Sequence, residues 1–382
     1  MRSLRAFGGA CLVVSVVAGC TPPDLSGPTA RPAAPRAVGP AFDYPWGLSE
    51  TDFGTLGGTR AGFNGADFDG DAVGWLVDAS GRQRAVYCVL GNFWRDRTCK
   101  ELGTLPGGSR SEAISIANDR IVGNSETASG ATHAVLWTED PAGGWKVTDL
   151  GTLGGENSVA TRINALGYVI GASQVSTGEW HGYLRSPGKS LTDLIGNDKG
   201  WNIIPLGLSE TDSLAVGYRA GGPGELHQAA YVKKWCLYVP LCDPAKPFQA
   251  RLVGSFPYDT HLTGISDDVM SASLARGYQH FLSYYVAVGS TTWKQVPVDQ
   301  FESVGIGYGK VIAGRWMCGT WPTGCRSLLW RAESNVTQEL APGKMNVTVR
   351  SIRGLYSAGS YLVNNTSHAV LWWYGPPVGV QP

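Results

Sequence analysis

The sequence lacks helical periodicity. No window of useful length places apolar residues at the three- and four-residue spacing of an amphipathic helix. Apolar residues instead alternate or form short groups, which Gly, Asn or Ser interrupt about every ten residues. This pattern is typical of short antiparallel strands joined by tight turns, so the chain is predicted to be all-β.

The sequence also lacks the local signatures of common enzymes. It has no Gly-x-Ser-x-Gly elbow, no His-Glu-x-x-His pair and no phosphate-cradling loop. Because enzymes on repeat scaffolds often scatter their acids over loops, an enzyme remains an alternative, with Asp212, Asp259 and Asp267 as candidate acids. The sequence favours a non-catalytic protein.

The chain has no excess of charge of either sign. Lys and Arg number 31, as do Asp and Glu, and removal of Arg2 and Arg5 with a leader would leave a balance of −2. A protein that binds nucleic acid needs clustered positive charge to meet phosphate. We therefore expect no nucleic-acid partner.

The apolar stretch near the N-terminus is short. Residues 6–17 form a mostly apolar run of twelve residues that follows two positive charges, which fits a signal peptide and is too few residues to span a bilayer as a mature helix. Val17-Ala18-Gly19-Cys20 then resembles the lipobox of bacterial lipoproteins. That resemblance implies a signal peptide over residues 1–19 and a diacylglycerol anchor on Cys20. The alternative is an ordinary secretory signal with an incidental cysteine.

The residues after the lipobox bear on the location of the protein. Residues 20–40 are rich in Pro and Ala and predict an extended tether that cannot bury enough surface to fold. Thr21, rather than Asp, follows the cysteine. By resemblance to lipoprotein sorting patterns, this implies export to the outer membrane or cell surface.

Six cysteines remain once Cys11 and Cys20 are set aside. They fall into three close pairs, which predict three local disulfides in an oxidising compartment: Cys88 with Cys99, Cys236 with Cys242, and Cys318 with Cys325. Reduced buried thiols are the alternative. None of the pairs has the two-residue spacing of a zinc knuckle, so we expect no metal at them.

A glycine-rich tract is present in three copies. It reads Asp-Leu-Gly-Thr-Leu-Gly-Gly at 149–155, with related copies at 53–58 and 102–108. Gly54, Gly103 and Gly151 are separated by 49 and 48 residues. This period belongs to four-stranded propeller blades.

Seven repeating units can be traced by their third strands, which begin near residues 85, 133, 181, 228, 280, 327 and 368. Six units are followed by a fourth strand, near 99–105, 147–153, 190–195, 249–254, 293–299 and 336–340, whereas the seventh is not. An unpaired strand at 50–56 precedes the first unit. The chain therefore predicts a β-propeller of seven four-stranded blades closed by its N-terminal strand, with six or eight blades as alternatives.

The repeated motifs carry a family resemblance. Asp-Leu-Gly-Thr-Leu-Gly-Gly at 149–155, Ile-Asn-x-x-Gly-x-Val-Ile-Gly at 163–171 and His-Ala-Val-Leu-Trp at 133–137 and 368–372 resemble the HAF repeat of bacterial extracellular proteins. The match is close in units two and three, whereas units four to six keep the strand rhythm without the glycine tract. The resemblance implies a secreted or surface-attached repeat domain over residues 41–382. It brings no catalytic residues.

Histidines recur at the start of the third strands, but equivalent positions lie around the whole ring and cannot converge on one ion: His133, His181, His227, His280 and His368. Two units carry Arg84 and Arg326 there instead, which favours a structural role. Asp67, Asp69 and Asp71 resemble the opening of a calcium loop. Ala72 and Asp78 stand where that loop needs Gly and Glu, so a turn is favoured. We expect no metal and no cofactor.

Fourteen tryptophans divide into two groups. Trp137, Trp330 and Trp372 end third strands and are predicted to pack between blades. Trp201, Trp316 and Trp321 fall outside the repeating positions and are the candidate binding residues.

These patterns together predict a lipid-anchored β-propeller of the cell envelope that serves as a non-catalytic binding or scaffold module. Its expected partners are the membrane, through the lipid, and a protein or glycan, held first at the loops containing Cys236–Cys242 and Cys318–Cys325. The alternatives are a secreted polysaccharide lyase or glycosidase and a purely structural surface component.

Overall fold

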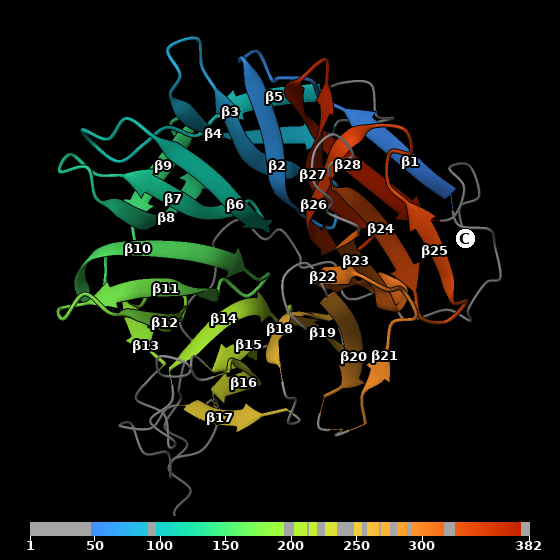
Figure 1. The fold of residues 1–382 in the computed structure, drawn as a ribbon. Coiled ribbons are helices and arrows are strands. Elements are labelled where there is room, and N and C mark those ends of the chain that lie inside the picture. Colours follow the sequence, from blue (N-terminus) through green and yellow to red (C-terminus); the bar gives the residue numbers. More distant parts are fainter. Residues whose placement is uncertain are drawn as a thin grey trace, which may run out of the picture. The chain divides into compact units, whose positions relative to one another are not determined.

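Short antiparallel strands make up almost all of the secondary structure in this computed structural model (Figure 1). The structure describes residues 47–90, 97–194, 202–211, 214–219, 226–234, 248–253, 258–266, 269–275, 281–288, 290, 292–316 and 325–375. Their strands form seven four-stranded sheets. The described residues all belong to one unit, and the predicted number of blades is confirmed.

Each blade runs outward from an inner strand. Blade 1 has β2 (Arg60–Ala66), β3 (Ala72–Val77), β4 (Gln83–Leu90) and β5 (Arg97–Glu101). Blade 2 has β6 (Ser111–Ala117), β7 (Arg120–Glu126), β8 (Thr132–Glu139) and β9 (Trp145–Asp149). Blade 3 has β10 (Gly154–Ile163), β11 (Val169–Val175), β12 (Trp180–Arg185) and β13 (Leu191–Asp193). Blade 4 has β14 (Ile203–Leu208), β15 (Ala215–Arg219), β16 (Gln228–Lys234) and β17 (Phe248–Leu252).

The remaining blades follow the same order. Blade 5 has β18 (Asp259–Ser266), β19 (Val269–Ala275), β20 (Phe281–Ala287) and β21 (Lys294–Gln295). Blade 6 has β22 (Phe301–Gly307), the 3₁₀ turn η2 (Tyr308–Lys310), β23 (Val311–Trp316), β24 (Arg326–Arg331) and β25 (Val336–Glu339). Blade 7 has β26 (Met345–Arg353), β27 (Tyr356–Val363), β28 (Thr366–Gly375) and, from the other end of the chain, β1 (Gly47–Asp52).

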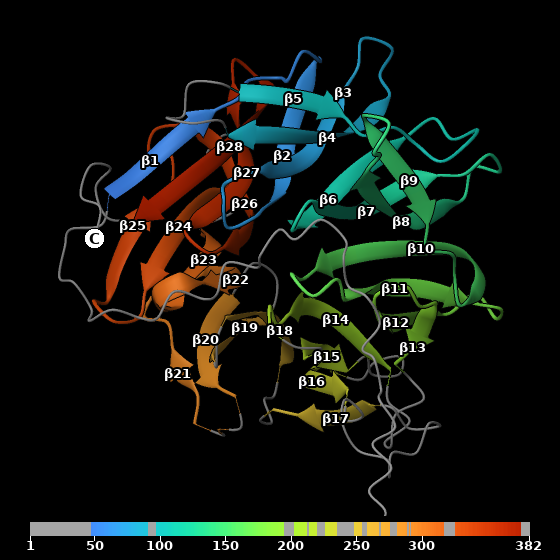
Figure 2. The ribbon, with the colours of Figure 1, turned by 180° about the vertical axis from the view of Figure 1, so that it is seen from behind.

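Strand β1 closes the ring, as the sequence predicted. It pairs antiparallel with β28 from Gly47 opposite Gly375 to Asp52 opposite Val370. The Glu50 carboxylate accepts hydrogen bonds from Tyr361 Oη and Trp372 Nε1, both at 2.9 Å. In Figures 1 and 2, β1 lies beside β28 at the outer edge of blade 7.

The fourth strands end earlier than the sequence predicted. The predicted strand at 50–56 is β1 at Gly47–Asp52, and those at 99–105 and 147–153 end at Glu101 and Asp149. The glycine tract forms the turn to the next blade instead. Gly54, Gly103 and Gly151 have φ values of +66°, +81° and +75°, which a strand residue with a side chain rarely adopts.

One backbone hydrogen bond recurs at this turn in every blade. The residue after the fourth strand donates its N–H to a carbonyl near the start of the third strand: Phe53 to Ala369, Leu102 to Ala85, Leu150 to Ala134, Leu194 to Gly182, Val253 to Ala229, Val296 to Ser283 and Leu340 to Ser327. Blades that have lost the glycine tract therefore keep this hydrogen bond at the turn.

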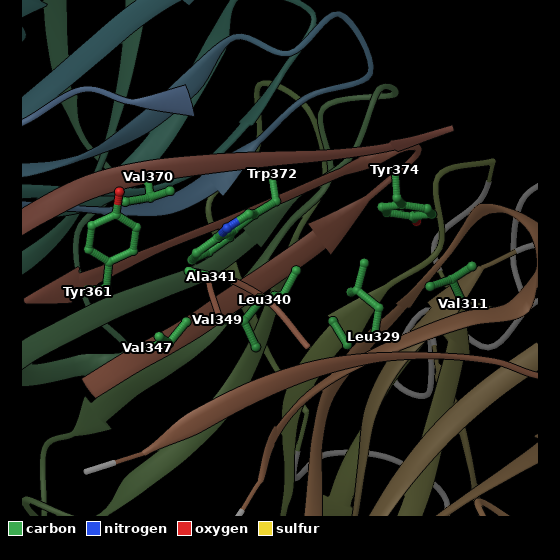
Figure 3. Packing of buried hydrophobic residues seen from close by; sticks show 11 residues of the cluster. Val311, Leu329, Leu340, Ala341, Val347, Val349, Tyr361, Val370, Trp372 and Tyr374 are labelled. Atoms are coloured by element: carbon green, nitrogen blue, oxygen red, sulfur yellow. The ribbon is translucent and has the colours of Figure 1, made fainter. Parts of the chain in front are cut away.

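The hydrophobic core lies between blades. Each cluster of buried side chains in the described residues combines two neighbouring blades, and the clusters cover all seven interfaces. Figure 3 shows one of them, in which Trp372 and Tyr374 of β28 lie with Leu329 of β24. Trp137, Trp330 and Trp372 are almost fully buried in these clusters, which confirms their predicted packing role.

Hydrogen bonds also join every neighbouring pair of blades. A group on a third strand bonds to the inner strand of the next blade: Ala85 N–H to Ser111, Ala134 N–H to Ser158, Gly182 N–H to Asn202 and His227 N–H to Asp259. The ring continues with Ser303 N–H to Ser283, Val349 N–H to Ser327 and Ser367 to the Ala61 carbonyl. Because each of these groups has a partner, its hydrogen bond offsets the cost of removing it from water.

A candidate binding funnel at the entry face

The inner strands surround one central passage, which has two different ends. We call the end at which the inner strands begin the entry face and the end at which they finish the exit face. A cavity of about 590 Å³, the funnel, lies on the entry side and includes the first residues of β18 and β20, Asp259 and Phe281. A narrower channel of about 50 Å³ lies on the exit side, where Ile163 and Arg353 end β10 and β26.

Each inner strand has a register shift at the same place. The two strands of the first hairpin lose alignment between, for example, Phe63 and Gly65 in blade 1 and Ala160 and Arg162 in blade 3. The residues just after the shift line the channel: Gly65, Ser115, Arg162, Gly207, Gly264, Gly305 and Ser351.

Six of these seven positions hold Gly or Ser because the strands converge there. A Cβ on Gly264 would lie 2.8 Å from the Cα of Gly305, which is closer than real Cβ atoms approach. Blade 3 has Arg162 instead, and this residue lines both the funnel and the channel. Arg162 is thus the one long side chain in a ring of small residues.

Arg162 shares the channel with one ion pair. Arg353 of blade 7 forms a salt bridge with Glu210, which follows β14, and also donates to the Ile116 carbonyl of blade 2. Arg162 donates to the Thr161 carbonyl at 3.0 Å, its only hydrogen bond among the described residues. Burial, reinforced by the charge of Arg353, lowers the pKa of Arg162 to about 10, while Glu210 opposes this shift.

One histidine, His261 of blade 5, lines the funnel. Its Nε2 lies 2.9 Å from Nδ1 of His227, which precedes β16 of blade 4, and both rings stack on Tyr218. Burial, together with the neighbouring His227, lowers the pKa of His261 to about 4, so His261 is neutral at pH 7.

Blade 6 contributes a charged pair to the funnel. Arg315 Nη2 lies 2.7 Å from Glu302 Oε1, and both residues line the cavity. The Arg315 Nε group is buried without a hydrogen-bond partner. Nearby, Thr263 Oγ1 lies 2.9 Å from Ser303 Oγ, so hydroxyl groups continue the polar wall between blades 5 and 6.

Two residues singled out from the sequence lie at this face. Trp316 ends β23, where it is half-buried, packs against the core between blades 5 and 6, and has the Arg326 guanidinium 5.8 Å from its ring centre. Asp259 lines the funnel, but its carboxylate accepts the His227 N–H at 2.7 Å and so occupies the position of the Ser and Asn side chains that join other blades.

Among the predicted cysteines, the structure describes Cys88, Cys99 and Cys325. Cys88 and Cys99 are bonded, as predicted, and face each other in the β4–β5 ladder. Cys325 is disulfide-bonded as well, and Cys318, its predicted partner, is outside the described residues. The same is true of Cys20, Trp201, Asp212, Cys236, Cys242, Asp267, His280 and Trp321.

Three of the recurring histidines belong to a pair that repeats in blades 2, 3 and 7. His133, His181 and His368 place Nδ1 2.8–3.0 Å from the Asp that ends the fourth strand: Asp149, Asp193 and Asp52. Arg326 lies 3.4 Å from Glu339, which has the same place in blade 6. These contacts support the structural role expected for the position.

Asp67 forms a turn between β2 and β3. Its buried carboxylate accepts the backbone N–H groups of Asp69 and Asp71, both at 3.0 Å. Asn164 has the same place in blade 3 and accepts the Tyr168 N–H. Burial and the neighbouring Asp71 raise the pKa of Asp67 to about 7.

Within the described part of the chain, no three His, Cys, Asp or Glu side chains are grouped so as to hold a metal ion. Nor do the described ranges contain a helix with the length and apolar character needed to span a bilayer.

Sequence reasoning missed Arg162, Arg315 and Glu302. The available signal was the alignment of the inner strands, in which Arg162 stands against Gly and Ser. Aligning the inner strands requires knowing where each register shift falls. Blades 4 to 6 lack the glycine tract, so their residues cannot be numbered from a common starting point.

Comparison with known proteins identifies the fold. No family model and no curated protein matches the chain. Among solved structures, a puromycin-hydrolyzing peptidase from Mycobacterium tuberculosis is similar, with a TM-score of 0.53, 11% identity and coverage of 86% of this chain and 53% of that one. A puromycin hydrolase has a TM-score of 0.55, 14% identity and coverage of 81% and 51%.

A lectin from Burkholderia pseudomallei is also similar, with a TM-score of 0.46, 11% identity and coverage of 87% of this chain and 98% of that one. The chain spans about half the length of the two hydrolases. At these identities the similarity to the hydrolases concerns the fold alone. This similarity, together with the seven four-stranded sheets and the β1–β28 pairing that closes their ring, establishes a seven-bladed β-propeller.

Proposed function

We propose that this protein is a non-catalytic binding module of the bacterial cell envelope that holds its ligand in the funnel. The observation that supports this most is the cavity itself, since about 590 Å³ is within the range of small-molecule sites. Blades 5 and 6, which have drifted from the repeat motif, provide most of its walls, whereas blades 1 and 7 provide none. Drift at a ligand site is expected when contacts with a ligand replace the demands of the repeat.

The engaged carboxylates of the funnel favour binding over glycoside cleavage. A glycosidase needs one carboxylic acid that can give up a proton and a second carboxylate that acts as a base or nucleophile. Asp259 joins blade 5 to blade 4 through the His227 N–H, and Glu302 is paired with Arg315. Both acids therefore have structural partners.

Filling the funnel tests its role. Ala275 is half-buried at the end of β19 and lines the cavity, so Ala275→Trp should occupy the space with a minimal change to the strand. Thr98→Trp places the same side chain on the exposed strand β5 and is the matched control. The full chain would be tested on an array of immobilised bacterial glycans.

We expect Ala275→Trp to abolish binding and Thr98→Trp to leave it unchanged. Equal binding by both variants would show that the funnel is not the binding site. The absence of any bound glycan would contradict a glycan ligand. Chromatography of the bound glycans tests the enzyme alternative, because a lyase or glycosidase would release shortened products. A purely structural component predicts no ligand for either variant.

We further propose that Cys20 attaches the protein to the envelope by a lipid and that its blades belong to the HAF-repeat type. The apolar stretch at 6–17, the sequence Val17-Ala18-Gly19-Cys20 and the repeated motifs support these assignments. Two acyl chains give stable attachment, at about 0.8 kcal/mol per buried methylene. Cys20→Ser should move the protein from the membrane fraction to the soluble fraction. Retention in the membrane would show a different attachment.

A further inference from the structure

The channel carries more positive than negative charge. Two guanidinium groups, from Arg162 and Arg353, share one carboxylate, Glu210. Arg353 holds that carboxylate in a salt bridge and gains the Ile116 carbonyl as well. Arg162 is left with one backbone carbonyl. A buried charge without a counter-charge is costly, so an anion at this point would be bound favourably.

The funnel gives such an anion access to Arg162. Arg162 lines the funnel as well as the channel, so a ligand in the funnel lies next to this residue. Arg353 and Glu210 line only the channel. A ligand entering from the funnel therefore reaches Arg162 before the ion pair.

We propose that Arg162 binds the carboxylate of an acidic saccharide that occupies the funnel, a sugar of the uronic acid class. The assignment rests on the proposed binding function and adds to it the chemical class of the ligand. The planar guanidinium can donate two parallel hydrogen bonds to a carboxylate, a geometry that a neutral sugar cannot match.

The walls of the funnel favour a sugar over an apolar ligand. Thr161 and Thr263 line the cavity. The Thr161 hydroxyl donates to the Ile170 carbonyl, and the Thr263 hydroxyl is hydrogen-bonded to Ser271 and Ser303, so each oxygen keeps a lone pair that can accept from a sugar hydroxyl. His261 is neutral at pH 7 and uses Nε2 toward His227, and no bond to its Nδ1 is present among the described residues. Phe281 adds one aromatic surface, against which a sugar ring can pack.

The remaining charges argue against a densely charged polymer. Asp259 and Glu302 line the funnel, and Arg315 is already paired with Glu302. A ligand with several closely spaced anionic groups would therefore meet like charge around Arg162. One carboxylate at the floor avoids this repulsion.

Titration calorimetry with the full chain tests the assignment. The probes are the dimers of glucuronate and galacturonate, and the neutral counterparts are the same dimers after reduction of the carboxyl groups. We expect the acidic dimers to bind and the reduced dimers to bind at least about tenfold more weakly, because a charge-assisted hydrogen bond is lost. Arg162→Gln should weaken the acidic dimers by a similar factor and leave the reduced dimers unchanged, and Arg162→Lys should recover part of the loss.

The control is Arg110→Gln, which removes a guanidinium from the exposed loop before β6. It should leave all affinities unchanged. Equal affinity for acidic and reduced dimers, or an unchanged affinity of Arg162→Gln, would overturn the assignment, as would failure of every acidic dimer to bind. Neutral glycans that bind wild type but not Ala275→Trp would still support the funnel. Should Arg162→Gln fail to fold, the comparison of acidic with reduced dimers on the wild-type chain decides.

Discussion

Arg162 illustrates a conflict between stability and binding in a single residue. The position favours a small side chain, because the inner strands converge there and the equivalent residues in other blades are Gly or Ser. Arg162 instead places a guanidinium next to Arg353, and the pair shares Glu210. Functional sites commonly keep such unfavourable arrangements at a cost in stability.

We therefore expect Arg162→Gln to raise the free energy of unfolding of the ligand-free protein by about 1–2 kcal/mol, since it removes a buried charge without a dedicated partner. Arg353→Gln is the comparison, because it removes the same group but breaks the salt bridge to Glu210 and with it a link between blades 7, 2 and 4. It should lower the stability. Chemical denaturation of both variants checks the prediction, and a loss of stability in Arg162→Gln would contradict it.

Asp67 should make the protein less stable as the pH rises. Its pKa is about 7 in the folded protein, against an ordinary value of 3.8, so between these limits the folded state binds more protons than the unfolded state. Asp67→Asn, which introduces the residue found at Asn164 in blade 3, removes this dependence. Relative to wild type, the variant should gain on the order of 4 kcal/mol between pH 4 and pH 8. Thermal unfolding across this range is the measurement, and a constant difference between the two proteins would contradict it.

His261 has the opposite effect on stability. Its pKa is lowered from 6.5 to about 4, so the unfolded state binds more protons in this interval and stability is lost as the pH falls from 6.5 to 4. His261→Gln should remove that loss, so that relative to wild type it gains on the order of 2 kcal/mol on acidification.

The contributions of Asp67 and His261 oppose each other between pH 4 and 6.5. A nearly flat profile of the wild-type protein would therefore be compatible with both shifts, and only the single variants separate them. As the pH rises from 4 to 6.5, the stability of Asp67→Asn relative to wild type should increase, and that of His261→Gln should decrease. If both relative stabilities change in the same direction, one of the two assigned pKa shifts is wrong.

At the scale of the strand, inner and outer elements are held by different interactions. Inner and middle strands bury most of their residues, whereas every residue of β5 is exposed. Hydrophobic burial cannot hold β5, so its attachment depends on the ladder to β4 and on the Cys88–Cys99 disulfide. The glycine tract also acts at this scale, since its three copies form the turns from β1, β5 and β9 to the inner strands β2, β6 and β10.

Removing the disulfide should loosen blade 1 in particular. A closed loop of this length is expected to contribute about 2–3 kcal/mol. We expect Cys88→Ala with Cys99→Ala to lower the stability by that amount and to increase hydrogen exchange in residues 97–101, with little change in blade 3, which provides an internal control. Uniform exchange changes throughout the ring would contradict a local role.

At the scale of the whole molecule, the sequence predicted the architecture well and the site poorly. Strand order, blade number and closure follow from the period of the glycine tract and from the seventh unit, which lacks a fourth strand. The funnel depends on residues from five blades, and their positions relative to the register shifts cannot be counted from the sequence alone. Asp259 shows the difficulty. From the sequence it is a candidate catalytic acid, whereas in the structure its carboxylate accepts the His227 N–H and links blade 5 to blade 4.

Closure by β1 should determine the stability of the entire ring. Thr51 lies in β1 two residues before Phe53, and Lys100 has the equivalent place in β5 before Leu102. Proline at either position costs about 3 kcal/mol locally because it cannot donate to the ladder. Only Thr51→Pro also exposes the edge of β28 and separates the two ends of the ring. We expect it to lower the melting temperature much more than Lys100→Pro and to cause aggregation, as measured by calorimetry and light scattering. Equal effects of the two prolines would mean that the stacked blades hold the ring together without the N-terminal strand.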